Sequence, residues 1–299
     1  MKLEHRLFRV MLFAGSALGA MSAMGASPSA ALAQTSASSA TPEVVVTANK
    51  KEEKLHDVAN AISAIGEESL QVRALTDFQD FAAQVPGFTV TQFGTTLNRL
   101  TIRGENTDGG GATVGIVIDE MPFSYSTGIA DGSITTTNLT TYDLERVEVL
   151  RGPQGTLYGA GAEGGLLKYV TAKPKFTGFD AGIEGGVQAV EHGQAAANVK
   201  GFVNIPFNDT FAVRVMAYDE VLPGWINNWV TGQKAYNHGV REGGRITALW
   251  TPFKDLTITA QVATQEVHAG GGNAVDVYGA ALTPSTPPAN AMSFVKGYS

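Results

Sequence analysis

The sequence predicts a compact α+β unit followed by antiparallel transmembrane β-barrel strands, an incomplete barrel of about six strands. Strand and helix signals alternate up to residue 174, and the later stretches alternate apolar with polar residues. There is no cysteine, so stability has to come from packing or from a hydrogen-bonded sheet. We expect four parts: a signal peptide at 1–33, a flexible N-terminus at 34–54, the α+β unit at 55–175 and barrel strands at 176–299.

The first 33 residues have the features of a cleaved secretory signal. Lys2, Arg6 and Arg9 precede an apolar run over residues 10–24, and residues 31–33 (Ala-Leu-Ala) fit a leader-peptidase site. A membrane anchor is the alternative, but the most hydrophobic part of the run is short and a cleavage site follows it. The pattern therefore favours export.

The composition restricts the possible partners. The formal charge is −7 and no basic stripe is present, so we expect no nucleic-acid partner. No stretch after the signal is apolar enough for a membrane-spanning helix, so contact with a membrane is expected through β-structure or a peripheral partner.

Residues 43–48 (Glu-Val-Val-Val-Thr-Ala), here called the box, lie between a polar tail at 34–42 and a charged run at 49–54. Three consecutive valines are typical of a buried strand. A strand between a flexible tail and a charged run is alternatively a detachable edge with which another protein can pair.

The α+β unit is predicted from one helix and several strands. Thr76 and Gln79 fit a capping box, apolar residues follow at helical spacing, and Pro86-Gly87 ends the helix. The apolar helix positions are Phe78, Phe81, Ala82 and Val85. The expected strands are 88–93, 100–103, 114–119, 147–150 and 166–171.

After Pro174, regular alternation predicts long strands with one apolar face and one face that can hold charge. Lys200, Asn204, Arg214, Arg245 and Thr247 lie on the polar face. Asn208-Asp209 and Lys254-Asp255 are expected tight turns, whereas 219–238 and 268–290 are long connections. Phe207, Phe211, Trp250 and Phe253 gather beside the short turns, as in an interfacial aromatic girdle. A soluble β-sandwich is the alternative, but the asymmetric connections favour a barrel.

The glycine-rich stretch 159–164 matches the G-x-G-x-x-G dinucleotide fingerprint. That motif needs a helix directly after it, whereas residues 166–171 predict a strand. Glycine is then expected for tight turns and for close backbone approach.

These residues resemble the plug domain of the TonB-dependent outer-membrane receptors. The matching motifs are Val147 to Pro153 (VEVLRGP), Leu157 to Gly159 (LYG), Gly164-Gly165, Thr171 to Pro174, Val85 to Gly87 (VPG) and Ile102 to Gly104 (IRG), with the box resembling the TonB box. One departure is Lys168, where many members have Asn.

The resemblance implies a barrel of about 22 strands with the plug inside it. It implies uptake of a scarce, bulky nutrient, such as an iron chelate, with energy supplied by TonB. Outer-membrane lipid is the other expected partner, and no cofactor and no enzyme activity are expected. The implied TonB-binding residues are Glu43, Val44, Val45, Val46, Thr47 and Ala48.

The resemblance also implies roles for other residues. Arg103, Glu148 and Arg151 would lock the plug to the barrel, with partners beyond residue 299. The ligand would meet outer loops of the plug and the first long loop, for which the candidates are Gln92, Arg99, Asn106, Tyr125, Trp225, Trp229 and Tyr236. The histidines show no metal-ligand spacing, so no metal site is expected.

The predicted barrel strands are fewer than the minimum of about eight in single-chain barrels, so we expect the N-terminal part of a longer receptor. The alternative is a non-transporting module that binds at most a ligand or TonB in the periplasm. A passive porin would lack the box and the α+β unit.

Overall fold

The computed structural model describes residues 45–47, 50–51, 53–58, 60–93, 97–105, 111–123, 138–159, 161–191, 193–227, 232–271 and 293–294. The predicted signal peptide and the polar tail after it lie outside these ranges. All contacts described below lie within one unit of the chain, residues 43–299.

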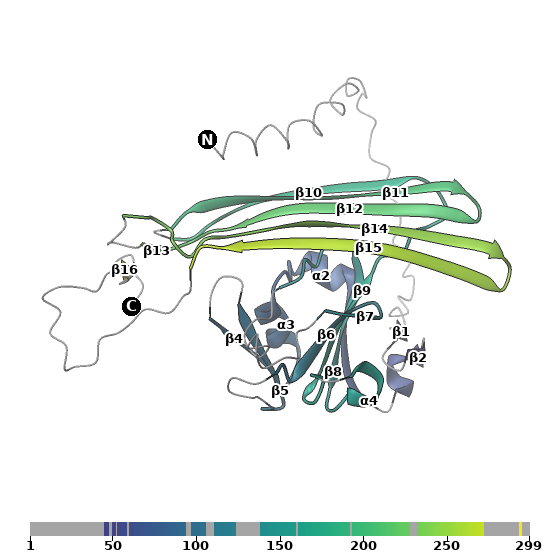
Figure 1. The fold of residues 1–299 in the computed structure, drawn as a ribbon, viewed down its shortest axis with the longest axis horizontal. Helices are drawn as coiled ribbons and strands as arrows, with labels where there is room; N and C mark the ends of the chain where they lie inside the picture. Colours follow the sequence, from purple (N-terminus) through teal and green to yellow (C-terminus); the bar gives the residue numbers. More distant parts are fainter. Residues whose placement is uncertain are drawn as a thin grey trace, which may run out of the picture. The chain divides into compact units, whose positions relative to one another are not determined.

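The α+β unit contains a mixed five-stranded sheet with the strand order β3-β8-β9-β6-β7 (Figure 1). Its strands are β3 (Ala61–Gly66), β6 (Val114–Ile118), β7 (Met121–Pro122), β8 (Leu144–Arg151) and β9 (Gly165–Thr171). β6 runs parallel to β9, and the other neighbours are antiparallel. β4 (Phe88–Gln92) and β5 (Asn98–Ile102) form a separate hairpin, and β1 (Val45–Val46) pairs with β2 (Glu53–Lys54). The predicted strands 88–93, 100–103, 114–119, 147–150 and 166–171 are confirmed.

Short helices accompany the sheet: η1 (Leu55–Asp57), α2 (Glu67–Val72), α3 (Phe78–Gln84) and α4 (Gly155–Tyr158). The apolar stripe predicted for α3 is confirmed, because Phe78, Phe81 and Val85 are buried in the core beside Tyr169. The predicted capping box is wrong by one position. Asp77 is the N-cap and Asp80 completes the box, because aspartate at both positions can accept the free backbone N–H groups.

The glycine-rich stretch has the expected non-nucleotide context, since β9 and not a helix follows Gly164. Gly159 ends α4 with φ +82°, a conformation that favours glycine. A Cβ at Gly165 would lie 2.4 Å from the Leu150 carbonyl oxygen and 2.7 Å from Ile102 Cδ1. Gly165 therefore allows close approach of β9 to its neighbours.

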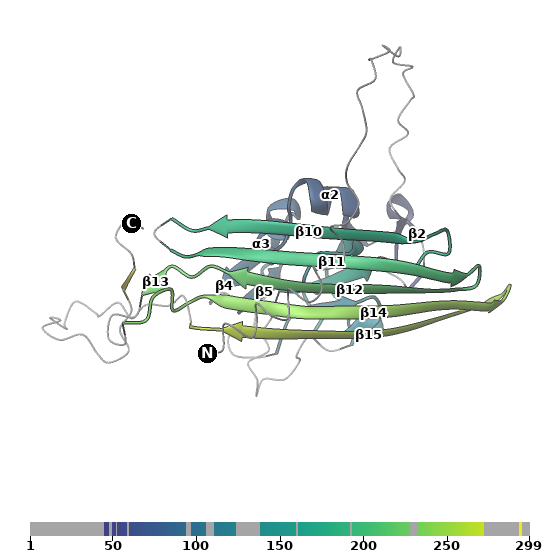
Figure 2. The same ribbon diagram turned by 90° about the horizontal axis from the view of Figure 1, so that it is seen from above.

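Five long strands follow in the order β10-β11-β12-β14-β15, all antiparallel, and Figure 2 shows them side by side. They are β10 (Asp180–Ala189), β11 (Ala195–Asn208), β12 (Phe211–Leu222), β14 (Gly239–Phe253) and β15 (Leu256–Ala269). Within the described ranges β10 and β15 each have one unpaired edge, so the sheet is an unclosed barrel.

The two faces of this sheet have inverted burial. On the face here called the outer face, Val187 is 88% exposed and Val262 is 72% exposed. On the opposite, inner face, Lys200, Arg214 and Arg245 are buried. Charged residues are inside and apolar residues are outside, which is the pattern of a barrel in lipid and the reverse of a soluble sheet.

The connections agree with the predicted asymmetry. Two residues join β11 to β12, and Lys254 and Asp255 join β14 to β15. Beside the first turn the rings of Phe207 and Phe211 lie 5.4 Å apart, and Phe211 is the register partner of Trp250. The aromatic cluster at the short turns is confirmed.

A last short strand is described near the end of the chain. β16 (Ser293–Phe294) pairs with β13 (Ile226–Asn227) in a separate two-stranded sheet and does not extend β15. Among the described residues, none of the helices is both long enough and apolar enough to cross a membrane.

Candidate functional site

The box is held as a short strand on the α+β unit. Val45 pairs with Lys54 and Val46 with Glu53 in a two-residue antiparallel ladder. Val46 is fully buried, whereas Val45 is 39% exposed. The strand predicted here is confirmed over Val45–Val46, while Glu43, Val44 and Ala48 lie outside the described residues.

Thr47 attaches the box to the central strands of the α+β unit through its backbone. Its N–H donates to Glu148 Oε1 at 2.9 Å, and its carbonyl oxygen accepts from Lys168 Nζ at 3.2 Å. Its hydroxyl also donates to Glu148 Oε1, at 3.2 Å. Both backbone groups of one residue are thus bound by buried side chains of opposite charge.

A small ion network surrounds this contact. Arg146 Nε donates to Glu148 Oε1 at 2.8 Å, and Lys168 Nζ donates to Glu120 Oε1 at 2.7 Å. The ammonium of Lys168 also lies 5.8 Å from the ring centroid of Tyr158. Burial, with smaller effects of Glu120 and Glu148, raises the pKa of Tyr158 to about 12, so the ring is neutral at physiological pH. The network satisfies buried charges that would otherwise be costly.

A second cluster joins the α+β unit to the inner face of the five-stranded sheet. Asp143 accepts from Arg214 Nε at 2.8 Å and from Arg245 Nη2 at 2.8 Å. Its carboxylate is 1% exposed and its backbone has φ +59°. The guanidinium of Arg214 also lies 4.0 Å from the ring centroid of Phe202. We call Asp143, Arg214 and Arg245 the arginine clamp.

Neutral hydrogen bonds extend this contact over the inner face. Asn204 exchanges two hydrogen bonds of 2.9 Å with the backbone of Lys175, where the α+β unit ends. Gln265 donates to the Asn138 carbonyl oxygen at 3.2 Å, and Gln261 donates to the Thr171 hydroxyl at 3.3 Å. The inner face thus holds the α+β unit with polar contacts from several of its strands.

Arg214 and Arg245 lie on the polar face, as predicted, but their pairing with Asp143 was not predicted. The signal was present, because an arginine on the buried face of a strand needs a carboxylate partner. The sequence did not indicate which carboxylate pairs with Arg214, because Asp143 is 71 residues away from it.

The predicted lock residues have different surroundings. Glu148 contacts Thr47 and Arg146 within the α+β unit. Arg151 donates to the Pro86 carbonyl oxygen at 3.3 Å, and Arg103 has φ +57° and is exposed. Neither arginine has a carboxylate partner within the described ranges, so the lock stays a prediction.

Four of the seven predicted ligand residues are described, and they lie in two places. Gln92 and Arg99 lie on the β4–β5 hairpin, where the guanidinium of Arg99 is 4.9 Å from the ring centroid of Phe93. Trp225 and Tyr236 lie in the β12–β14 connection, which is closed by the Tyr236 N–H donating to the Ile226 carbonyl oxygen. Asn106, Tyr125 and Trp229 lie outside the described residues.

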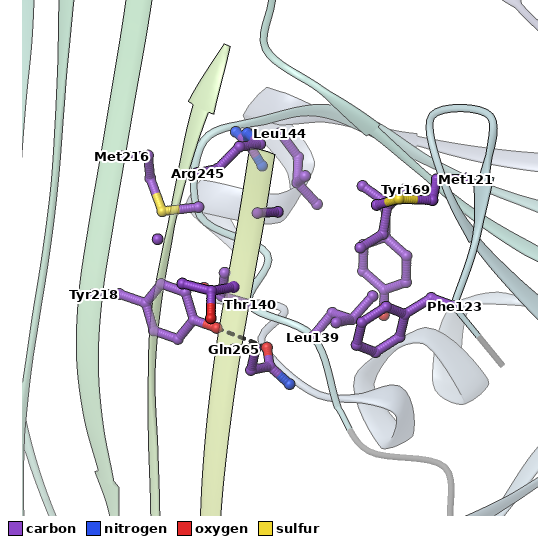
Figure 3. Close-up of a pocket in the computed structure, with 14 residues that line it drawn as sticks. Met121, Phe123, Leu139, Thr140, Leu144, Tyr169, Met216, Tyr218, Arg245 and Gln265 are labelled. Atoms are coloured by element: carbon purple, nitrogen blue, oxygen red, sulfur yellow. Dashed lines mark hydrogen bonds between the residues drawn. The ribbon is translucent and has the colours of Figure 1, made fainter. Parts of the chain in front are cut away.

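A partly open pocket lies where the α+β unit meets the sheet (Figure 3). Leu139, Tyr169 and Met216 contribute to its mainly apolar wall, and the Tyr218 hydroxyl donates to Gln265 Oε1 at 2.6 Å across one side. None of the four predicted ligand residues that the structure describes lines this pocket.

One group of potential metal ligands was missed by the spacing argument. Ligand atoms of Glu242, Glu266 and His268 lie within 4.8 Å of one another, because β14 and β15 are adjacent. His268 Nε2 is 2.7 Å from Glu266 Oε1, and both side chains are more than half exposed. Exposed acidic groups that lie this close together are common without a metal ion.

Comparison with known proteins agrees with this architecture. Residues 54–166 match the model of the TonB-dependent receptor plug domain. The chain is 29% identical over 194 residues to the iron-regulated outer membrane virulence protein of Vibrio cholerae, covering 58% of this chain and 26% of that protein. It is 30% identical over 178 residues to the pesticin receptor of Yersinia pestis, covering 58% and 25%. The chain thus spans about a quarter of the length of these relatives.

Solved structures share the fold. The ferric yersiniabactin uptake receptor of Yersinia pestis has a TM-score of 0.59 at 24% identity, covering 70% of this chain and 32% of that one. The ferripyoverdine receptor of Pseudomonas aeruginosa has a TM-score of 0.58 at 16% identity, covering 79% and 31%. Residues 54–166 therefore form a plug domain of the TonB-dependent receptor type, and antiparallel strands of an unclosed barrel follow it.

Proposed function

We propose that this protein acts as a TonB-dependent receptor in the outer membrane. The observation that carries the proposal is the inverted burial of the five-stranded sheet, whose apolar outer face suits lipid while its charged inner face holds the plug. The names of the relatives, which are outer-membrane and receptor proteins, support the same location.

The proposed partner is TonB, which would bind the box by strand addition. Val45 and Val46 already adopt extended pairing geometry in the ladder with β2. In strand addition the main chain supplies the hydrogen bonds, so the backbone of the box matters more than its side chains. Each such bond nets only about 0.5–1.5 kcal/mol, which allows a reversible grip.

The proposed ligand is a small organic molecule of the iron-chelate class. Support comes from the iron-regulated protein of Vibrio cholerae and, at the level of the fold, from the ferric yersiniabactin receptor. The candidate contacts among the described residues are Gln92, Arg99, Trp225 and Tyr236. Arg103 and Arg151 are proposed to hold the plug against parts of the barrel wall outside the described residues.

Export is proposed to require removal of residues 1–33. The mature N-terminus would then be Gln34. Membrane fractionation of the expressed chain and N-terminal sequencing would check both the location and the cleavage site.

Val45→Pro tests the partner. Proline removes a backbone donor from the ladder, so we expect affinity of the detergent-solubilised chain for the periplasmic domain of TonB to fall at least tenfold. Val45→Ala keeps the N–H group and should bind like the parent chain. Equal binding of TonB by the parent and the proline variant would contradict the box assignment.

A further inference from the structure

Thr47 lies between two buried charges of opposite sign. Glu148 on β8 and Lys168 on β9 are register partners in the central sheet, and they are 0% and 1% exposed. Glu148 accepts the Thr47 N–H, and Lys168 donates to the Thr47 carbonyl oxygen. One residue of the box is therefore fixed directly to two adjacent central strands of the plug.

We propose that Glu148 and Lys168 form a clamp on Thr47, here called the box clamp, which sets how readily the box leaves the plug for a partner strand. This inference rests on the proposed strand addition. Lys168 is the member that binds the carbonyl oxygen of Thr47, and Glu148 is the member that binds its N–H group. The two residues act as positioning residues and do not contact the partner.

The box clamp and the burial of the Val46 side chain together hold the box. The β1–β2 ladder is only two residues long, which by itself is a weak attachment. Hydrogen bonds to charged groups are stronger than neutral ones, and both bonds of the box clamp are of this kind. A partner strand must therefore compete with the box clamp before it can pair with the box.

When the box leaves the plug, buried charged groups of the plug lose hydrogen bonds. Glu148 Oε2 is buried and has no hydrogen-bond partner within the described ranges, so Oε1 carries all of the recorded contacts of this carboxylate. Loss of Thr47 would remove two of them and leave Lys168 with Glu120. Buried charges that lose hydrogen bonds are strongly disfavoured, so the docked state of the box is stabilised.

A thiol-labelling assay tests the box clamp. The chain has no cysteine, so Val46→Cys introduces a unique buried thiol on the box. We would measure its rate of modification by a sulfonated methanethiosulfonate in the detergent-solubilised full chain, without TonB. Adding Lys168→Met should raise the rate about tenfold or more, the equivalent of one charge-assisted hydrogen bond. Lys168→Arg should restore slow labelling.

Two controls make the outcome specific. Lys175→Met removes a lysine away from the box and should leave the labelling rate unchanged. Val85→Cys reports on the buried core of the plug at the end of α3, and Lys168→Met should not accelerate its labelling. An unchanged rate for the Val46→Cys thiol would overturn the box clamp. Equal acceleration at both introduced thiols would also overturn it, because the plug as a whole would then be loosened.

The outcome is independent of the TonB experiment. No partner is present during labelling, so failure here removes the box clamp and leaves strand addition standing. Failure of the Val45→Pro experiment would remove strand addition and leave the labelling rates as a property of the plug.

Discussion

The plug and the five-stranded sheet follow opposite rules of burial in one chain. The plug places Phe78, Phe81 and Tyr169 in its core, as a water-soluble domain does. The sheet exposes Val262 and Phe253 and buries Arg214 and Arg245. The same alternating pattern of residues thus has different consequences, because none of the described parts of the chain forms a layer over the apolar face of the sheet.

This difference shows what holds each region. Apolar burial of about 25 cal/mol per Å² can stabilise the plug by itself. The buried apolar clusters contain plug residues only, and the inner face of the sheet contacts the plug through charges and amides as well as through Met216 and Tyr218. The arginine clamp and the Asn204 contacts therefore determine how the two regions stay together.

Among the variants proposed here, Asp143→Asn is expected to lower the free energy of unfolding the most. Asparagine tolerates the positive φ at this position, so the change removes the charge without straining the backbone. Arg214 and Arg245 would be left buried without their carboxylate, and the free energy of unfolding should fall by about 3–5 kcal/mol. Denaturant unfolding of the full chain in detergent, followed by hydrogen exchange in β8, would measure it.

The matched control is Asp57→Asn, because the Asp57 side chain is 60% exposed and contacts only His56 among the described residues. Its effect should stay within about 0.5 kcal/mol. If Asp143→Asn also lowered the free energy of unfolding by less than about 1 kcal/mol, the arginine clamp would not stabilise the contact between the plug and the inner face.

Val262→Arg tests the lipid side of the comparison. Val262 is an exposed apolar residue in the middle of β15 and pairs with Ile246 on the outer face. In lipid vesicles an arginine there should cost about 2–4 kcal/mol of folding free energy. Thr259→Arg, three residues earlier on the inner face, should cost less than half as much. Equal costs for both variants would contradict the assignment of the outer face to lipid.

The fold was predictable because its signals are local. Alternation along β11, β12 and β14 gives both faces of the sheet, and the apolar spacing of 78–85 gives α3. β3 and α2 were missed, since Ala61 to Val72 contains few strongly apolar residues in a regular pattern. The pairing of β16 with β13 joins segments far apart in the chain, and no local signal specifies such a contact.

The site was predictable only in part, because contacts between segments far apart in the chain leave no local signal in the sequence. The box was found from its three valines, but its attachment depends on Glu148 and Lys168, which lie 101 and 121 residues further along than Thr47. Lys168 was noticed as a departure from the family pattern without a role. Asp143 stood beside the matched motif, yet its arginine partners come from strands that sequence spacing cannot align with it.

Asp80→Ala has the smallest expected effect. It tests whether the capping of α3 stabilises the plug, as helix capping does in soluble domains. The Asp80 carboxylate accepts the backbone N–H groups of Thr76 and Asp77 at 2.8 and 2.9 Å. Losing them leaves orphan donors at the start of α3, so the plug should lose about 1 kcal/mol of stability. Glu68→Ala, on the exposed first turn of α2, is the control and should change it by less than about 0.5 kcal/mol. If both variants unfold at the same denaturant concentration as the parent chain, α3 is held by the packing of Phe78 and Phe81 alone, and its capping contributes nothing measurable.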